Sequence, residues 1–386
     1  MLRPIAGTSA VLLLLAAPLG RAHDGPQTPK PPEAATAEAS FEARLRALEE
    51  REAELYHTLA EKKEADGLGL AERLTISSLL EVEASASRIK FAGGKRASSS
   101  DLVLATAQLG FGLKINEWVN GDLSFLFEED VTDLEVDEAA INLSRGAFSA
   151  RVGRQYLPFG VFYSHFITDP LTLELGETRE TAFLSSYEYG PAKLSAFVFN
   201  GDAEKAGEGD HLRDWGASLV VTPLEGLRLG GSWLSDLADS NAELLGGAEY
   251  RRRVGGWSLF AILERGAFGL SGELLGAART FAAADLDADG SGGGDKPFAW
   301  NVEAAWLPRE DLEVALRYEA SRQFAGQPTR QYGVDVSWSP WKAVTLSVEY
   351  LRGHFRGAFA GDELVNSSGS PAKTRDVVTT QLALQL

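Results

Sequence analysis

Residues 103–115 read VLATAQLGFGLKI, and this stretch alternates between two kinds of side chain. From Val103 to Ile115 every second residue is apolar, and from Thr106 onward the residues between them are small or polar. Because successive side chains of a β-strand point to opposite faces, this period of two predicts a strand with one apolar and one polar face. The run exceeds the mean soluble strand of about 5–6 residues. It could cross a bilayer as a tilted strand of about 9–11 residues.

The same period recurs to the end of the chain, interrupted by tight turns and longer polar segments in alternation. We expect strands near residues 70–90, 102–116, 118–128, 135–144, 147–156, 182–190, 191–200, 212–222, 225–235, 256–264, 267–279, 298–306, 311–322, 330–338, 343–355 and 376–386. These are sixteen strands, an even number, so both ends of the array lie on one side. Residues 243–252 also resemble a strand, but a further strand would break this parity. We therefore assign them to a hairpin-like part of an outer loop.

Two all-β architectures fit such strands, a soluble sandwich and an antiparallel transmembrane β-barrel. The polar faces stay small or charged over most of the chain, which favours a barrel whose polar faces line a lumen. Tryptophans also collect beside the tight turns, where an interfacial girdle would lie: Trp118, Trp306, Trp338 and Trp341. We predict an all-β fold, a transmembrane β-barrel of about sixteen strands over residues 70–386, wide enough for an aqueous lumen.

The N-terminal residues predict export. Arg3, a short apolar run and small residues near Ala22 have the form of a secretory signal peptide over residues 1–22. Residues 23–40 are rich in Pro, Ala, Thr and Glu and read as a flexible tether. Residues 41–66 carry apolar side chains at heptad spacing, which predicts a short periplasmic coiled-coil helix. Together these segments indicate a barrel in the outer membrane with its N-terminal helix in the periplasm.

Composition excludes other classes of protein. The 386 residues carry a formal net charge of −18, which argues against a nucleic-acid partner. There is no cysteine, so disulfides and thiolate metal sites are excluded. We expect the lipid bilayer and a small-molecule solute as partners, with a homotrimer as a further alternative.

Residues 157–181, after the fifth predicted strand, have an unusual composition for a surface loop. They combine an aromatic side with a charged side, and two prolines prevent a plain strand. We predict that this segment folds into the lumen and forms the channel constriction; the alternative is an outer loop packed on its neighbours. The candidate constriction residues are Arg154, Tyr156, Phe159, Phe162, Tyr163, Asp169, Glu174, Glu177, Arg179 and Glu180.

Arginines accompany this segment. Arg151 and Arg154 flank it and Arg179 lies within it. Arginine stays charged and binds carboxylates in bidentate fashion. If these arginines face Glu174, Glu177 and Glu180, they set up a transverse field across the pore. The alternative is a structural network of salt bridges that holds the loop to the wall.

The run from Leu157 to Glu180, LPFGVF…DPLTLELGETRE, resembles a segment typical of LbtU-type siderophore porins. The order of signal peptide, short coiled coil and barrel is also similar. More distantly, a long outer loop after strand five resembles the constriction loop of trimeric sixteen-strand porins. The first resemblance implies passage of ferric siderophores through the outer membrane. The second is compatible with a homotrimer, and trimer and monomer stay alternatives. A plug domain with energy coupling is not expected, because plugged barrels have 22 strands.

Other candidate sites carry weaker patterns. Asp285, Asp287 and Asp289 have the spacing of a calcium loop, but Lys296 stands where a bidentate Glu is expected. We expect no cofactor, with calcium at this loop as the exception. Ser164 and His165 are sequence neighbours and form a poor catalytic dyad, so we expect no enzyme. A siderophore channel is the leading hypothesis. A cation-preferring general diffusion porin and a structural outer-membrane barrel are the alternatives.

Overall fold

The computed structural model describes Gly69 and residues 73–386, apart from residues 208, 210, 246–248, 360 and 362–363. The predicted signal peptide, tether and coiled-coil helix lie outside the described residues. Of the helices in the described part of the chain, none has the length and apolarity needed to cross a membrane.

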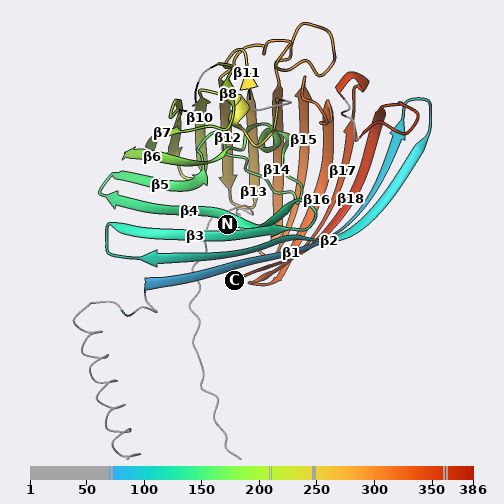
Figure 1. The fold of residues 1–386 in the computed structure, drawn as a ribbon. Helices are drawn as coiled ribbons and strands as arrows, with labels where there is room; N and C mark the ends of the chain where they lie inside the picture. The colour runs from blue at the N-terminus through green and yellow to red at the C-terminus, as the bar shows by residue number, and fades with distance from the viewer. Residues whose placement is uncertain are drawn as a thin grey trace, which may run out of the picture. The chain divides into compact units, whose positions relative to one another are not determined.

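Sixteen antiparallel strands form one closed barrel, as the sequence predicts. They are β1 (Leu74–Phe91), β2 (Arg96–Lys114), β3 (Val119–Glu128), β4 (Thr132–Arg145), β5 (Phe148–Tyr156), β6 (Arg179–Tyr189), β7 (Ala192–Phe199), β9 (Asp214–Leu224), β10 (Leu227–Leu234), β12 (Gly256–Arg265), β13 (Phe268–Ala277), β14 (Phe298–Arg309), β15 (Leu312–Arg322), β16 (Arg330–Trp341), β17 (Val344–His354) and β18 (Ala372–Gln385). The barrel closes because β1 pairs with β18, from Leu79 opposite Gln385 to Phe91 opposite Ala372 (Figure 1).

Tight turns and long loops occupy opposite ends of the barrel. Two-residue turns join β4–β5, β6–β7, β9–β10, β12–β13, β14–β15 and β16–β17. The turn between β9 and β10 requires a glycine, since Gly226 has a φ of +79° and a Cβ there would lie 2.0 Å from the Glu264 carbonyl oxygen. The four tryptophans predicted beside the turns are exposed: Trp118, Trp306, Trp338 and Trp341.

The two faces of the barrel reverse the usual distribution of a soluble protein. Large apolar side chains such as Val302, Leu316 and Val348 are exposed on the outer face. The residues beside them in the same strands, including Glu303, Arg317 and Glu349, are buried on the inner face. An apolar outer face and a charged inner face are the pattern of a barrel surrounded by lipid rather than by water.

Two local predictions were wrong. The second strand was expected to begin near residue 102, but β2 begins at Arg96 and only residues 92–95 connect it to β1. The residues after Arg96 are mostly polar, which hides the alternation, yet they extend the strand. In this run the Ser99 hydroxyl lies 2.9 Å from the Ser87 hydroxyl of β1.

The second concerns residues 243–252, whose described part lies outside the barrel as expected but does not form a hairpin. Within them β11 (Glu249–Tyr250) pairs in parallel with β8 (Glu204–Lys205), a strand of the preceding outer loop, rather than in a hairpin. This two-stranded sheet is separate from the barrel.

The outer loops also contain the described helices. These are α3 (Leu171–Gly176) and two short 3-10 helices, η1 (Leu237–Asp239) and η2 (Gly357–Phe359). The main apolar cluster combines Phe159, Leu175, Leu237 and Leu275, from the segment after β5, the loop after β10 and the wall strand β13. This cluster positions the candidate site.

Candidate channel constriction

Residues 157–178 leave the barrel wall between two adjacent strands and return to the same place. Tyr156 at the end of β5 is the cross-strand partner of Arg179 at the start of β6. The Leu157 backbone N–H donates to the Thr178 carbonyl oxygen at 2.8 Å. Pro170 precedes α3, where its missing N–H costs no helical hydrogen bond. The segment is therefore an excursion from the wall, 157–178 rather than 157–181.

Carboxylates on the inner face of the barrel bind the backbone of this segment. Glu273 of β13 accepts from the N–H groups of Val161 and Phe162 at 2.9 and 3.0 Å. Glu303 of β14 accepts from the His165 N–H at 2.7 Å. Hydrogen bonds to charged groups contribute about 1.5–3 kcal/mol each, so these contacts fix the segment against the wall.

Two more strands continue this series. Glu349 of β17 accepts from the backbone N–H and the hydroxyl of Thr168, the former at 3.0 Å. Glu319 of β15 accepts from the Leu171 N–H at 2.8 Å. The segment thus starts at β5, reaches β13, β14, β15 and β17, and ends at β6.

Arg317 of β15 joins the wall carboxylates to the segment. Its fully buried guanidinium lies 2.7 Å from Glu303 and 3.7 Å from Glu319. It also donates to the Thr168 carbonyl oxygen at 2.8 Å and to the Ser164 hydroxyl. A planar fork of five donors suits such a junction better than a lysine would.

The aromatic side of the segment faces the apolar cluster. Phe159 is fully buried there and Phe162 packs against it. Tyr163 is buried, and its hydroxyl donates to Glu264 at 2.8 Å. Gly160 has a φ of +85°, and a Cβ there would lie 2.5 Å from the Phe162 ring. Only glycine fits this close approach.

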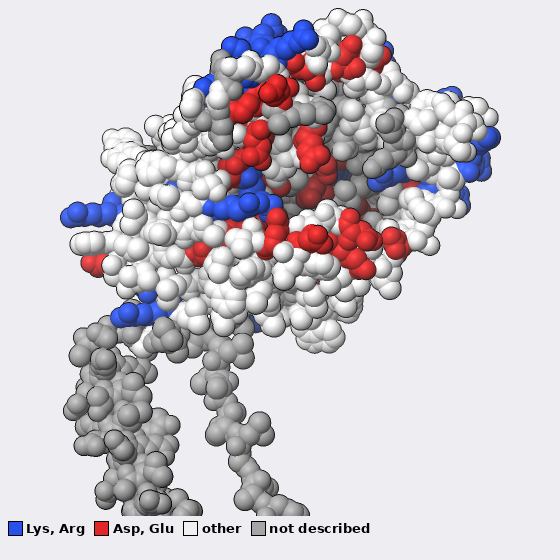
Figure 2. Space-filling model, in the orientation of Figure 1, with Lys and Arg blue, Asp and Glu red and all other residues white. Residues whose placement is uncertain are grey.

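The charged side of the segment remains accessible. Asp169 and Glu174 are exposed, and Glu177 is half-buried. Glu177 accepts a hydrogen bond from the Asn241 side chain at 3.0 Å. Glu180 lies in β6 opposite Gln155 of β5. Figure 2 shows acidic residues gathered around the opening of the barrel, with basic residues among them.

The arginines have nearer partners than the predicted glutamates. Arg179 contacts Asp137 at 2.8 Å and also Glu135, both in β4. Arg154 lies 3.8 Å from the same Glu135. No ion pair in the described residues joins these arginines to Glu174, Glu177 or Glu180. A transverse field between the two groups stays a prediction.

Arg151 belongs to the same acidic neighbourhood. Its guanidinium lies 2.7 Å from Asp122 of β3 and 3.0 Å from Glu138 of β4. Tyr156 donates its hydroxyl to Asp137 at 2.9 Å, and its ring lies 5.8 Å from the Arg179 guanidinium carbon. Tyr156 and Arg179 are thus brought together by Asp137, which sequence analysis did not single out.

Sequence analysis also missed Arg317 and the wall carboxylates. They could be placed on the polar faces of their strands by alternation. Their contacts with the segment join residues 111 to 181 positions apart, as with Glu273 and Phe162 or Glu349 and Thr168. Alternation carries no information about such distant contacts.

In each of the two weaker candidate sites, the residues named from sequence contact different partners. Ser164 contacts Arg317, while the His165 ring nitrogen Nδ1 lies 2.8 Å from Glu313. In the Gly-rich loop, Asp287 and Asp289 gather with Asp295. Asp285 instead accepts from the backbone N–H groups of Arg251 and Arg252. Asp295, not Asp285, is therefore the third carboxylate of that group.

Comparison with known proteins finds distant relatives by sequence. No family model matches the chain. A UPF0422 protein of Coxiella burnetii is 26% identical over 321 residues, covering 77% of this chain and 68% of the relative. A UPF0422 protein of Legionella pneumophila is 21% identical over 293 residues, covering 66% of this chain. The chain spans about half of that relative, 54% of its length.

Solved structures of outer-membrane channels share the fold. The anion-selective porin from Comamonas acidovorans has a TM-score of 0.59 and 12% identity, covering 81% of this chain and 99% of the porin. The channel DcaP of Acinetobacter baumannii has a TM-score of 0.56 and 15% identity, covering 81% and 97%. OmpF of Salmonella typhi, in a complex with daunomycin, has a TM-score of 0.56 and 12% identity, covering 81% and 98%. At these identities the likeness concerns the fold alone.

Proposed function

We propose that this chain is an outer-membrane channel that passes small solutes passively through the barrel. Residues 157–178 would form its constriction. The observation that carries the proposal is the anchoring of this segment to the inner wall by Glu273, Glu303, Glu319 and Glu349. A segment fixed across a lumen narrows it and places its own charges in the path of a solute. The exposed apolar outer face supports the membrane location.

The solute class we propose is the ferric siderophore, because the run from Leu157 to Glu180 resembles that of LbtU-type siderophore porins. A second candidate is general diffusion with a preference for cations. It is favoured by the exposed Asp169 and Glu174 on the segment. Arg151, Arg154 and Arg179 do not pair with these two groups, because they already contact carboxylates of β3 and β4.

Single-channel recording in planar bilayers tests both candidates. We expect stable current steps from the purified protein in KCl, arriving in threes if the channel is a trimer. Ferric hydroxamate and ferric catecholate siderophores are then titrated separately. Block by one class at low concentration supports the siderophore channel, and steps that neither class blocks support general diffusion. A complete lack of steps contradicts the channel itself.

Arg179→Gln is expected to increase the preference for cations. The substitution removes the positive charge beside Glu135 and the buried Asp137. The negative charges of these two carboxylates are then less compensated. The measurement is the reversal potential in a KCl gradient. Arg179→Lys should keep the wild-type value.

Arg145→Gln is the matched control. Arg145 is the last residue of β4, whereas Glu135 and Asp137 lie near the beginning of the same strand. An unchanged reversal potential in Arg179→Gln would assign Arg179 a structural role only.

A further inference from the structure

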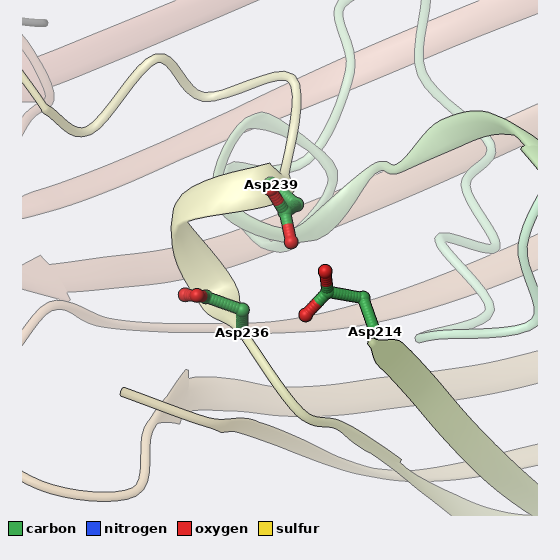
Figure 3. A group of neighbouring side chains, drawn as sticks. All are labelled: Asp214, Asp236 and Asp239. Carbon is green, nitrogen blue, oxygen red and sulfur yellow. The ribbon is translucent and has the colours of Figure 1, made fainter. Parts of the chain in front are cut away.

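Three buried aspartates lie close together where two outer loops meet. Asp214 is the first residue of β9, Asp236 caps η1, and Asp239 is its last residue. One oxygen atom from each lies within 4.8 Å of the others. In Figure 3 the carboxylates of Asp214 and Asp239 point toward one another, and Asp236 projects from the same short helical turn as Asp239.

One arginine contacts this group in the described residues. The Arg253 guanidinium lies 3.2 Å from Asp214 and 3.5 Å from Asp236. When all three carboxyl groups are ionised, they and the guanidinium together carry two negative charges (3 − 1 = 2) in a region shielded from water. Burying uncompensated charge is costly, so the arrangement calls for a further cation.

Asp239 carries an oxygen atom that lacks a donor. Its Oδ1 accepts from the Ala203 N–H at 3.0 Å. Its Oδ2 has no hydrogen-bond partner among the described residues, although only 7% of the residue is exposed. A buried carboxylate oxygen without a partner is unfavourable, and a cation bound to it would offset this cost.

The surrounding backbone holds Asp239 tightly in this position. A Cβ at Gly201 would lie 2.2 Å from the Asp239 carboxyl group, so glycine is needed for the loop to approach so closely. Asp236 accepts from the Ala238 N–H at 3.1 Å, which fixes the turn that carries both residues. The carboxylates are therefore held in place before any ion arrives.

We propose that Asp214, Asp236 and Asp239 form a binding site for a calcium ion. Calcium takes 6–8 oxygen ligands at about 2.3–2.6 Å in adaptable geometry, and water molecules can complete such a shell. Its charge of two matches the excess negative charge of the group. Magnesium fits less well, because it demands a near-ideal octahedron and gives up its water reluctantly.

A calcium ion bound here would stabilise the loops after β7 and β10. It joins residues 200–203 to the loop after β10. In that loop Leu237 packs in the same apolar cluster as Phe159, and the Asn241 N–H donates to the Glu177 carbonyl oxygen at 2.7 Å. A ligand that binds only the folded state raises its stability. Calcium should thus stabilise the barrel without being required for conductance.

The test measures calcium binding by calorimetry and thermal unfolding of the purified full-length protein in detergent, with CaCl₂, MgCl₂ or EDTA. Asp239→Asn removes one ligand charge and keeps the side-chain shape. It should remain at least as stable as the wild type in EDTA, because it removes one of three like charges. Asp287→Asn is the matched control in the Gly-rich loop.

We expect calcium to raise the midpoint of wild-type unfolding more than magnesium does. The Asp239→Asn variant should lose this shift and bind one calcium ion fewer, whereas Asp287→Asn should keep the shift. Calcium binding by Asp239→Asn equal to that of the wild type would overturn the proposal. So would the lack of any calcium shift in the wild type, or a shift lost only in Asp287→Asn.

Discussion

Replacement of residues 158–177 by Asn-Gly is expected to raise the single-channel conductance several-fold. The ends of this segment already meet, since Tyr156 pairs with Arg179 and Leu157 bonds to Thr178. A two-residue Asn-Gly turn suits strands that are paired in this way. With the segment gone, the lumen widens to the barrel wall, and any block by a solute that depends on the segment is lost.

The matched control is the same Asn-Gly replacement of residues 288–293, in the Gly-rich outer loop. Several of their contacts are local and exposed, such as the N–H of Gly292 to Asp287. This variant should conduct as the wild type does. If the first replacement folds and conducts no better than the control, residues 157–178 do not limit the current. The constriction hypothesis would then be wrong.

The second large effect is expected from Arg317→Ala, which should destabilise the barrel by about 3–5 kcal/mol. The substitution leaves Glu303 and Glu319 buried without their cation. It also removes the donors to Ser164 and Thr168, so the segment should loosen from the wall. We expect a lower urea midpoint for the protein folded in lipid vesicles, together with noisier current steps.

Arg309→Ala is the control of the same type. Arg309 pairs with Asp311 at an exposed turn, where an ion pair contributes about 0–1 kcal/mol. Adding Glu303→Gln to Arg317→Ala should recover part of the loss, because it removes one of the unpaired charges. Equal stability of Arg317→Ala and Arg309→Ala would contradict the role assigned to Arg317.

The sequence by itself determined the barrel. A period of two appears in runs such as 103–115, and tight turns and polar loops alternate around sixteen strands. Strand number and order follow from this pattern, because alternation is local and each turn joins neighbours in the chain. The prediction was wrong where composition hides the period, as in the polar start of β2 at Arg96. It also missed a pairing between two loops, β8 with β11.

Only the tertiary structure decided the site. The sequence marked residues 157–181 as unusual, and it named Phe159, Tyr163 and Arg179, but it could not identify their partners. Those partners, such as Arg317 and the wall carboxylates, lie on strands that are distant in the chain and become neighbours only when the barrel closes. The aspartate group of Asp214, Asp236 and Asp239 has the same origin. Period and spacing describe one strand or one loop, whereas a charged site forms where several of them meet.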